Sequence, residues 1–428
     1  MPDDRGAPSM PRFLPTGTSV RTAFVLLMGV TLGIAAGPQV LHPPAAGRAP
    51  TTVAAAERWV GTWGAAPAAG VTASGYAGYT IRNVVHTSVA GSTARVRLSN
   101  RFGTRPVLLA HATIALPAAR GSAAAAAGTV HDLLYGSSRT ITMPAGAEVY
   151  SDPVSLAVPA DADLMVTTFT PAPSGPVTYH PQAVQTSFFG TGGDHAGDTA
   201  ATAFAERTPA WHYVVGVEVL NGAVRGTLIA LGDSITDGVG STRDASRRWP
   251  NFLARRLLAL PEQDQLGVVD EGIGGNRVLL DGGGFGVNAV ARLDRDVLGH
   301  PAARTLIVLE GINDIQETPH QLDAAQIVAG LRQIAMQARA HGLRVLAGTL
   351  TPFGGWSTFD AAEEATRRAV NEFVRTDPVF DAYVDFDAAL RDPADPLRLQ
   401  PQFDSGDHLH PNDAGYQAMA AAVDLTLL

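Results

Sequence analysis

The sequence predicts two folded regions of different class, an all-β sandwich or jelly roll followed by an α/β region with a parallel sheet. The first prediction rests on short alternating apolar and polar segments, separated by Gly, Pro, Ser and Asn, that recur up to about Asn221. The second rests on apolar strand-like runs that alternate with helical stretches after Gly226. We therefore divide the chain into a leader (1–56), a β-sandwich-like accessory domain (57–222) and an α/β domain (223–428).

The leader has the composition of a targeting segment. Arg12 and Arg21 precede an apolar run over 22–36, and a stretch rich in Pro and Ala follows. This order is typical of a secretory signal peptide, and roughly 15 apolar residues fall short of the ~20 that a membrane-spanning helix needs. We expect a secreted protein that is cleaved near 35–37 or 54–56, with an uncleaved N-terminal anchor as the alternative.

Composition excludes several classes of function. With 428 residues and 46% hydrophobic content, the chain can build two or three sizeable cores. The net charge of -9 is dispersed, and no basic cluster is interleaved with aromatics, so we expect no nucleic-acid partner. Cysteine is absent, which excludes disulfides, thiol nucleophiles and Cys-ligated metals. The sequence contains Arg but no Lys, and this indicates a high-GC bacterial coding bias.

The β-rich region contains segments with the alternation of half-buried strands. The clearest are Thr80–Thr87, Ala94–Ser99, Leu164–Phe169 and Tyr213–Val219. The alanine run 123–127 predicts a loop between strands, with a short helix as the alternative.

The α/β region alternates strands and helices, which implies a parallel sheet covered on both faces. The predicted strands are Thr227–Leu231, Gly267–Asp270, Thr305–Leu309, Arg344–Leu350 and Tyr383–Phe386. The predicted helices are Pro250–Leu260, Ala289–Leu298, Ala324–Ala340, Ala361–Val374 and Asp413–Leu425. Ser234, Gly275 and Asn313 each follow one of the first three strands. Because ligands of such sheets bind beyond the carboxyl ends of the strands, we expect these three residues to share a site.

A serine stands at the turn after the first of these strands, in Leu231-Gly232-Asp233-Ser234-Ile235-Thr236-Asp237-Gly238. A tight strand-to-helix turn exposes the serine hydroxyl and aims backbone N–H groups at developing charge. Serine alone is a poor nucleophile, so this chemistry also needs a base, a group that orients the base, and an oxyanion hole.

The C-terminal segment Asp407-His408-Leu409-His410-Pro411-Asn412 offers the base. A carboxylate three residues before a histidine can accept from the Nδ1–H of that ring, which leaves Nε2 free to take a proton from Ser234. This spacing favours His410 oriented by Asp407. His408 is the competing base, but its neighbour Asp407 is badly placed to orient it.

Two loops offer donors for an oxyanion. In Gly272-Ile273-Gly274-Gly275-Asn276, a glycine permits close approach of a backbone N–H to a ligand, and a simple turn is the alternative. A dinucleotide-binding loop is excluded because Arg277 stands where the third glycine should fall. In Glu310-Gly311-Ile312-Asn313-Asp314, Asn313 adds a side-chain amide, although an Asn-Asp pair alone is more often a helix cap.

Taken together, these segments resemble the SGNH hydrolase (GDSL esterase/lipase) superfamily. G-D-S-I-T matches its first block, I-G-G-N-R its second, G-I-N-D its third and D-H-L-H-P its fifth, over about 226–428. The resemblance implies a flavodoxin-like three-layer α/β/α fold and a carboxylic ester hydrolase. It also implies a catalytic triad and an oxyanion hole. The triad is nucleophile Ser234, base His410 and orienting Asp407, and the oxyanion donors are Ser234, Gly275 (or Gly274) and Asn313.

Other residues near these blocks are expected to support the site. Asp233 and Asp237 are predicted to start the helix or to stabilise the turn, and Trp249-Pro250 to begin the next helix. Trp356 could line an acyl or sugar pocket, or pack in the core. No cluster has metal-ligand spacing, so we expect neither a metal nor a cofactor.

The sequence predicts the class of substrate in less detail than it predicts the catalytic residues. The two-part layout, beginning near 59–63, is similar to secreted bacterial xylan-associated acyl esterases, which implies short-acyl esters of small molecules or polysaccharides as partners. A lipase or phospholipase acting on longer chains is the first alternative. The second is a carbohydrate-binding protein that acts through Trp211, His212 and Tyr213.

Overall fold

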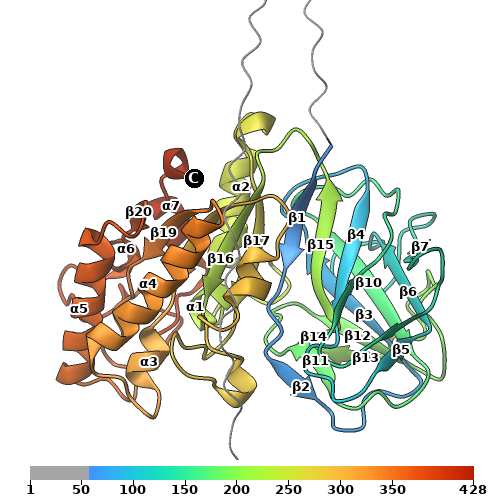
Figure 1. Ribbon diagram of the computed structural model, residues 1–428, viewed down its shortest axis with the longest axis horizontal. Coiled ribbons are helices and arrows are strands. Elements are labelled where there is room, and N and C mark those ends of the chain that lie inside the picture. Colours follow the sequence, from blue (N-terminus) through green and yellow to red (C-terminus); the bar gives the residue numbers. More distant parts are fainter. Residues whose placement is uncertain (1–56) are drawn as a thin grey trace, which may run out of the picture. The chain divides into compact units, whose positions relative to one another are not determined.

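The computed structural model describes residues 57–428, so the predicted signal peptide, its cleavage sites and the rest of the leader lie outside the described residues. Within 57–428, no helix is both long enough and apolar enough to cross a membrane. The β-rich and α/β regions belong to one compact unit (Figure 1). The division between them at residue 222 stays a prediction.

The β-rich region is built from antiparallel sheets. A four-stranded sheet has the order β1 (Trp59–Gly64), β15 (Val214–Leu220), β4 (Ala94–Ser99) and β9 (Glu148–Tyr150). A six-stranded sheet has the order β13 (Glu206–Thr208), β12 (Ser187–Thr191), β3 (Tyr79–His86), β10 (Asp163–Thr170), β6 (His111–Ala115) and β7 (His131–Asp132). Smaller sheets are formed by β14 (Trp211–His212), β11 (Val177–His180) and β2 (Ala69–Val71), and by β5 (Val107–Leu109) and β8 (Ile141–Met143).

The two larger sheets face each other across a shared core, as a sandwich requires. Ile81 and Val85 of β3 lie in the same buried cluster as Val96 of β4. Val84, between them in sequence, faces the other side of its sheet and packs with Phe188. This alternation is the two-residue period of a strand, and it confirms the predicted sandwich of antiparallel sheets.

The strands predicted here agree with the observed ones. Ala94–Ser99 coincides with β4, and the predictions for β3, β10 and β15 differ from the structure by one residue at each end. The alanine run 123–127 is a loop in which Ala125 forms an isolated bridge with Pro117, so the alternative of a helix is wrong.

The α/β region contains one parallel sheet, in the order β17 (Gly267–Gly272), β16 (Thr227–Gly232), β18 (Ala303–Leu309), β19 (Arg344–Gly348) and β20 (Ala382–Val384). Helices α2 (Trp249–Leu258) and α7 (Asp413–Ala422) pack together, as do α4 (Ala324–Ala340) and α5 (Ala361–Thr376) (Figure 1). The remaining helices are short: α1 (Ser234–Asp237), α3 (Ile312–Gln316) and α6 (Phe386–Leu390), with the single turns η1 (Glu262–Asp264), η2 (Gly283–Phe285) and η4 (Leu425–Leu427). Right-handed crossovers place the two helix pairs on opposite faces, which confirms the flavodoxin-like three-layer fold.

One predicted helix, Ala289–Leu298, is wrong over its first half. Residues 289–292 are turns, and only a π-helical segment follows, η3 (Asp294–Leu298). The side chain of Arg292 is fully buried and donates to the backbone carbonyls of Gly232 and Glu271 at 2.9 and 2.7 Å. The segment is therefore anchored to the ends of two strands, and it cannot lie on the sheet as a regular amphipathic helix.

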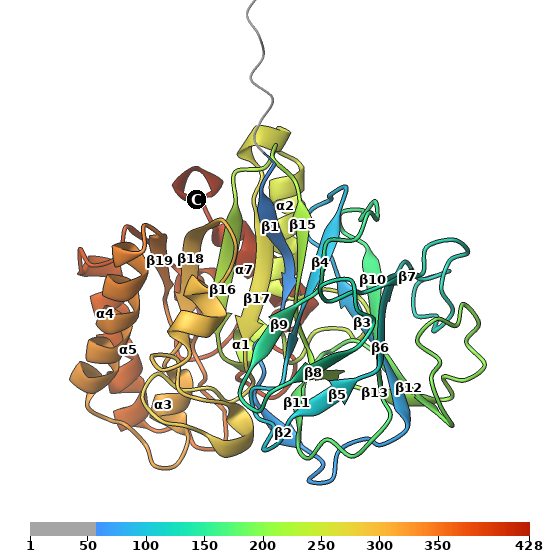
Figure 2. The ribbon, with the colours of Figure 1, turned by 45° about the vertical axis from the view of Figure 1, so that its right-hand side comes forward.

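Strands β1 and β17, one from each region, lie side by side (Figure 1, Figure 2). A Cβ on Gly267 would lie 2.1 Å from the carbonyl oxygen of Gly61, so this backbone contact needs glycine. The N–H of Val268 donates to Ser88 Oγ at 2.9 Å. The edge strand of the parallel sheet is thus covered by the β-rich region.

Candidate active site

Ser234 is the first residue of α1, directly beyond the carboxyl end of β16. Asp233 caps this helix, because its side chain accepts from the N–H of Ile235 at 2.8 Å. Gly238 ends the helix in the left-handed conformation, with a φ of 90°. The predicted strand-to-helix turn is confirmed, and so is the helix-start role of Asp233. As the first helical residue, Ser234 has an N–H without an intrahelical acceptor.

His410 lies between Ser234 and Asp407. Its Nε2 is 2.8 Å from Ser234 Oγ, and its Nδ1 is 2.6 Å from Asp407 Oδ2. Partial burial opposes ionisation of Asp407, but hydrogen bonds from the His410 ring and from the amides of His410 and Leu409 outweigh it and hold the pKa of Asp407 well below its usual range. Asp407 is therefore a carboxylate that fixes which nitrogen of His410 faces the serine.

His408 is turned elsewhere. Its Nδ1 is 2.6 Å from Asp404 Oδ2, and its side chain is 44% exposed. Sequence reasoning missed Asp404, although the i,i+4 spacing before His408 was available as a signal. Of the two candidate bases, the structure brings only His410 to Ser234.

The glycine loop after β17 provides a backbone donor. Gly275 has a φ of 76°, and a Cβ there would lie 2.6 Å from the ring of Phe285, so conformation and space both require glycine. Gly274 already donates its N–H to Asp237 Oδ2 at 3.2 Å. Within residues 57–428, the N–H of Gly275 has no hydrogen-bond acceptor. This arrangement favours Gly275 over Gly274 as the loop's available donor.

Asn313 lies in α3, beyond the end of β18, and is 2% exposed. Its Nδ2 donates to the carbonyl of Asn276 at 2.9 Å, and its Oδ1 accepts from Gln316 Nε2 at 2.7 Å. Gln316 Oε1 in turn accepts from Trp356 Nε1 at 2.7 Å. This relay fixes the amide of Asn313 with its NH₂ group toward the glycine loop.

Trp356 takes the second of its two predicted roles, packing in the core, and its lining of an acyl or sugar pocket stays a prediction. It packs on the core of the α/β region, and its ring meets that of His410 edge to face, with the centroids 6.1 Å apart. Trp249 fits its prediction, since it is the first residue of α2 and is fully buried.

Arg292 joins the active-site loops and was not found from the sequence. Besides the carbonyl of Gly232, it reaches that of Glu271 and the side-chain oxygen of Asn276, at 2.9, 2.7 and 3.0 Å. It forms buried ion pairs with Asp296 and Glu310, at 3.2 and 3.4 Å. The only signal in the sequence was an arginine inside an apolar segment.

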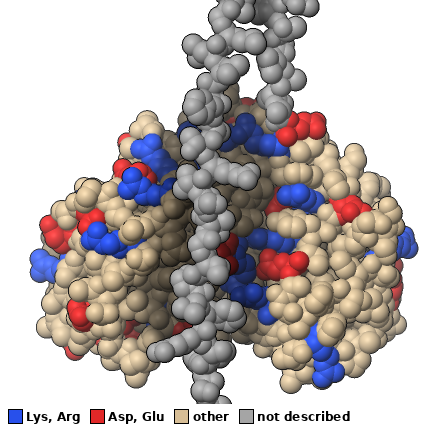
Figure 3. Space-filling view, in the orientation of Figure 1, with Lys and Arg blue, Asp and Glu red and all other residues tan. Residues whose placement is uncertain are grey.

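Acidic side chains around the serine turn are buried. Burial raises the pKa of Asp233 and of Glu310, and it raises that of Asp314 to about 6. These groups therefore hold their protons more tightly than exposed acids do. The surface shown in Figure 3 carries Arg and acidic side chains intermixed, without a field of one sign.

Comparison with known proteins finds one family match, over part of the chain. Residues 230–418 match the model of the GDSL-like lipase/acylhydrolase family. No curated protein matches the chain.

Solved structures are also similar to this chain. A member of the lipolytic protein G-D-S-L family from Veillonella parvula is 20% identical, with 47% of this chain and 96% of the other covered and a TM-score of 0.34. A carbohydrate acetylesterase from Sinorhizobium meliloti is 17% identical, with 46% and 95% covered and a TM-score of 0.35. The aryl esterase of M. smegmatis is 18% identical, with 46% and 95% covered and a TM-score of 0.37.

The matched segment contains the serine turn, the glycine loop, Asn313 and the pair Asp407 and His410. Residues 230–418 therefore match a GDSL-like lipase/acylhydrolase domain, and this part of the chain is a carboxylic ester hydrolase.

Proposed function

We propose that the chain is a secreted serine esterase that removes short acyl groups, acetyl above all, from hydroxyl-rich alcohols such as carbohydrates. One observation carries the proposal: hydrogen bonds run without a break from Asp407 through His410 to Ser234, at 2.6 and 2.8 Å. A hydroxyl in this arrangement has a base in hydrogen-bond reach and an oriented tautomer behind it. Secretion is proposed from the composition of the leader.

In the first step, Ser234 Oγ attacks the acyl carbonyl carbon, and His410 Nε2 takes the hydroxyl proton. The carbonyl oxygen becomes negative in the tetrahedral intermediate. We assign its stabilisation to the N–H groups of Ser234 and Gly275 and to the side-chain amide of Asn313. The carboxylate of Asp407 stabilises the imidazolium that forms.

In the second step, the intermediate collapses. The bond to the leaving alcohol breaks, His410 returns the proton to the alcohol oxygen, and the acyl group stays on Ser234. Water then attacks the acyl-enzyme with His410 again as the base, the bond between the acyl carbon and Ser234 Oγ breaks, and His410 returns the proton to Oγ as the product acid leaves. No metal or cofactor is used in these steps.

A cavity next to the glycine loop supports a polar alcohol. It has a volume of about 480 Å³, and charged residues Arg277, Asp281 and Glu317 line it together with Phe285. Phe285 is also the residue whose ring lies against Gly275. Leu280 and Pro319 add apolar surface, so the lining offers an alcohol both polar and apolar contacts.

The second alternative, carbohydrate binding through aromatics of the β-rich region, loses its support. Trp211, His212 and Tyr213 are 4%, 2% and 1% exposed. Trp211 Nε1 donates to the carbonyl of Val84 at 2.6 Å. These side chains are part of the core and offer no platform for a sugar ring.

The proposal is tested with p-nitrophenyl esters of increasing acyl length and with acetylated xylan. We expect hydrolysis that is fastest for acetate and that disappears in Ser234→Ala. A folded Ser234→Ala variant with wild-type activity would overturn the nucleophile. Rates that rise toward long acyl chains would instead favour the lipase alternative.

A further inference from the structure

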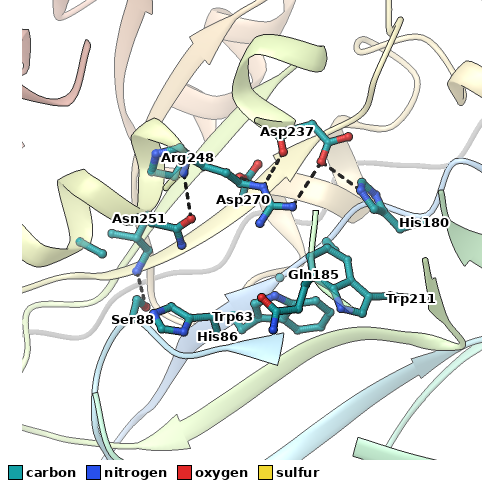
Figure 4. Close-up of a pocket in the computed structure, with 15 residues that line it drawn as sticks. Trp63, His86, Ser88, His180, Gln185, Trp211, Asp237, Arg248, Asn251 and Asp270 are labelled. Carbon is teal, nitrogen blue, oxygen red and sulfur yellow. Dashed lines mark hydrogen bonds and ion pairs between the residues drawn. The ribbon is translucent and has the colours of Figure 1, made fainter. Parts of the chain in front are cut away.

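A chain of hydrogen bonds connects the β-rich region to the active-site loops, and Figure 4 shows its link between His180 and Asp237. His180, the last residue of β11, lies between Ala66 and Asp237. Its Nδ1 is 2.8 Å from the carbonyl oxygen of Ala66, and its Nε2 is 3.0 Å from Asp237 Oδ1. Since a carbonyl and a carboxylate both accept, each ring nitrogen carries a proton and the ring is cationic.

The pair of His180 and Asp237 is buried. The two side chains are 2% and 3% exposed. Burial works against the charged ring, but the charge of Asp237 and its hydrogen bond outweigh burial and raise the pKa of His180. A buried ion pair of this kind holds its partners in one geometry, because separating them leaves an uncompensated charge.

The second oxygen of Asp237 reaches the glycine loop. Asp237 Oδ2 accepts from the N–H of Gly274 at 3.2 Å. Asp237 is also the last residue of α1, the short helix that begins at Ser234. One carboxylate therefore joins a strand of the β-rich region, the serine turn and the loop that carries Gly275.

The β-rich region also packs directly against the glycine loop. Ile273 is fully buried in a small cluster with Ala66 and Ala68. A Cβ on Gly274 would lie 2.5 Å from Gln182 Oε1. Both residues that precede Gly275 thus contact the β-rich region, which limits where its N–H can point.

We propose that His180 is a positioning residue for ester hydrolysis, through which the β-rich region holds the Gly275 loop in place relative to Ser234. This inference rests on the proposed roles of Ser234 and Gly275. An oxyanion donor is worth ~10²–10³ in kcat, and only when it lies close to the developing charge. A displaced loop should therefore lower kcat and leave KM nearly unchanged.

The first test compares variants of the full chain on p-nitrophenyl acetate. We expect His180→Ala to lower kcat by about 10- to 100-fold, with KM changed less than about twofold. Asp237→Ala should do the same. Asp237→Asn should retain most of the activity, because its amide oxygen can still accept from Gly274 while its NH₂ donates to a neutral His180 ring.

A matched control is available at the same interface. His86 pairs with Asp161 at 2.9 Å, and Asp161 pairs with Arg255 of α2 at 2.9 Å. This bridge also joins the two regions, but it does not contact the serine turn or the glycine loop. His86→Ala should lower stability and leave kcat within about threefold of wild type.

The second test reads the loop directly. Hydrogen exchange of the segment 272–276 should be faster in His180→Ala than in wild type, and unchanged in His86→Ala. The inference is overturned if kcat of His180→Ala equals that of wild type, or if it is lowered no more than kcat of His86→Ala. It is also overturned if hydrogen exchange of the segment 272–276 is the same in His180→Ala as in wild type. Should His180→Ala not fold, the contrast between Asp237→Asn and Asp237→Ala decides on the same readouts.

Failure of the proposed function would look different. Wild-type protein would then hydrolyse none of the esters, or Ser234→Ala would hydrolyse them equally well. Loop exchange would still report whether His180 holds the segment.

Discussion

Two histidines of the β-rich region, His86 and His111, are partnered differently from His410 of the α/β region, although all three lie beside a carboxylate. In the β-rich region, both ring nitrogens of His86 face carboxylates, those of Asp163 and Asp161, each at 2.9 Å. In the α/β region, His410 has a carboxylate on one side only, and its other nitrogen faces the hydroxyl of Ser234.

His111 repeats the first arrangement, with Asp194 on one nitrogen and Asp132 on the other, at 2.8 and 2.9 Å. A ring that donates from both nitrogens has no lone pair to offer a substrate. A ring with one carboxylate keeps a nitrogen for proton transfer. The comparison teaches that a His–Asp pair marks a candidate base only where the second ring nitrogen faces a nucleophile, as in His410 and not in His408.

The largest effect is expected from the base itself. His410→Ala should lower kcat/KM by ~10⁴-fold or more, because Ser234 loses its proton acceptor. His111→Ala should leave kcat/KM near wild type and lower only the melting temperature. Equal losses of activity in the two folded variants would break the comparison.

Removing the charge behind the base comes next. Asp407→Asn should lower kcat by ~10²–10⁴-fold, since a neutral amide neither fixes the tautomer of His410 nor stabilises its charged form. The hydrogen bonds that depress the pKa of Asp407 also make it a stabilising group. That stability is present above the unfolded-state pKa and is lost as pH falls through the lower folded-state value. Acid unfolding of wild type and variant, followed by circular dichroism, should therefore converge at the lowest pH.

Buried arginines extend the comparison to stability. Arg82 of the β-rich region binds Thr167, Ala123 and Asp198 much as Arg292 binds the active-site loops. Replacement of either by Met should cost about 3–5 kcal/mol in the free energy of unfolding, because buried acceptors lose a charged donor. Urea denaturation checks this effect. Only Arg292→Met should also lower kcat of the folded protein, because only Arg292 holds the active-site loops. An equal loss of kcat in Arg82→Met would contradict this expectation.

Asp270 of β17 is a carboxylate with no histidine partner. It lies 3.7 Å from Arg248, and its Oδ2 has no hydrogen-bond partner among the described residues. Burial raises its pKa to about 7, so its ionisation costs stability as pH rises from the unfolded-state value toward 7. When the pH is raised from 5 to 8, the free energy of unfolding of wild type should fall by about 2–4 kcal/mol more than that of Asp270→Asn. Parallel pH curves of unfolding free energy would contradict this expectation.

The smallest effect is expected at His408. Its Nδ1 is oriented by Asp404, but the ring does not reach Ser234. A general base typically raises the rate by ~10²–10⁴-fold. Because His408 is not the base, His408→Ala should lower kcat/KM by less than about fivefold. A loss equal to that of His410→Ala would reverse the choice between the two candidate bases.

Local patterns in the sequence were enough to predict much of this molecule. Each strand of the parallel sheet has a buried apolar run followed by a turn, so β16, β17 and β18 were located and Ser234, Gly275 and Asn313 were placed at one edge. The three-residue spacing of Asp407 and His410 was enough to predict their contact. These features depend on residues that are close in sequence, or on a fold rule that applies to every parallel sheet.

Contacts between distant residues were not predicted. His180 and Asp237 are 57 positions apart, and Arg292 reaches Gly232 across 60. No periodicity links such pairs, because their meeting depends on how whole layers pack. The same limit explains the error in the helix predicted over 289–298, where the buried side chain of Arg292 overrides an apolar pattern.

The close contact of Gly61 and Gly267 has a consequence for solubility. A chain reduced to residues 223–428 would leave the backbone of β17 open, and an open edge is where sheets from separate molecules join and aggregate. We therefore expect residues 223–428 on their own to be less soluble than the full chain. Any foreign domain grafted in place of the β-rich region would need a glycine where Gly61 now stands.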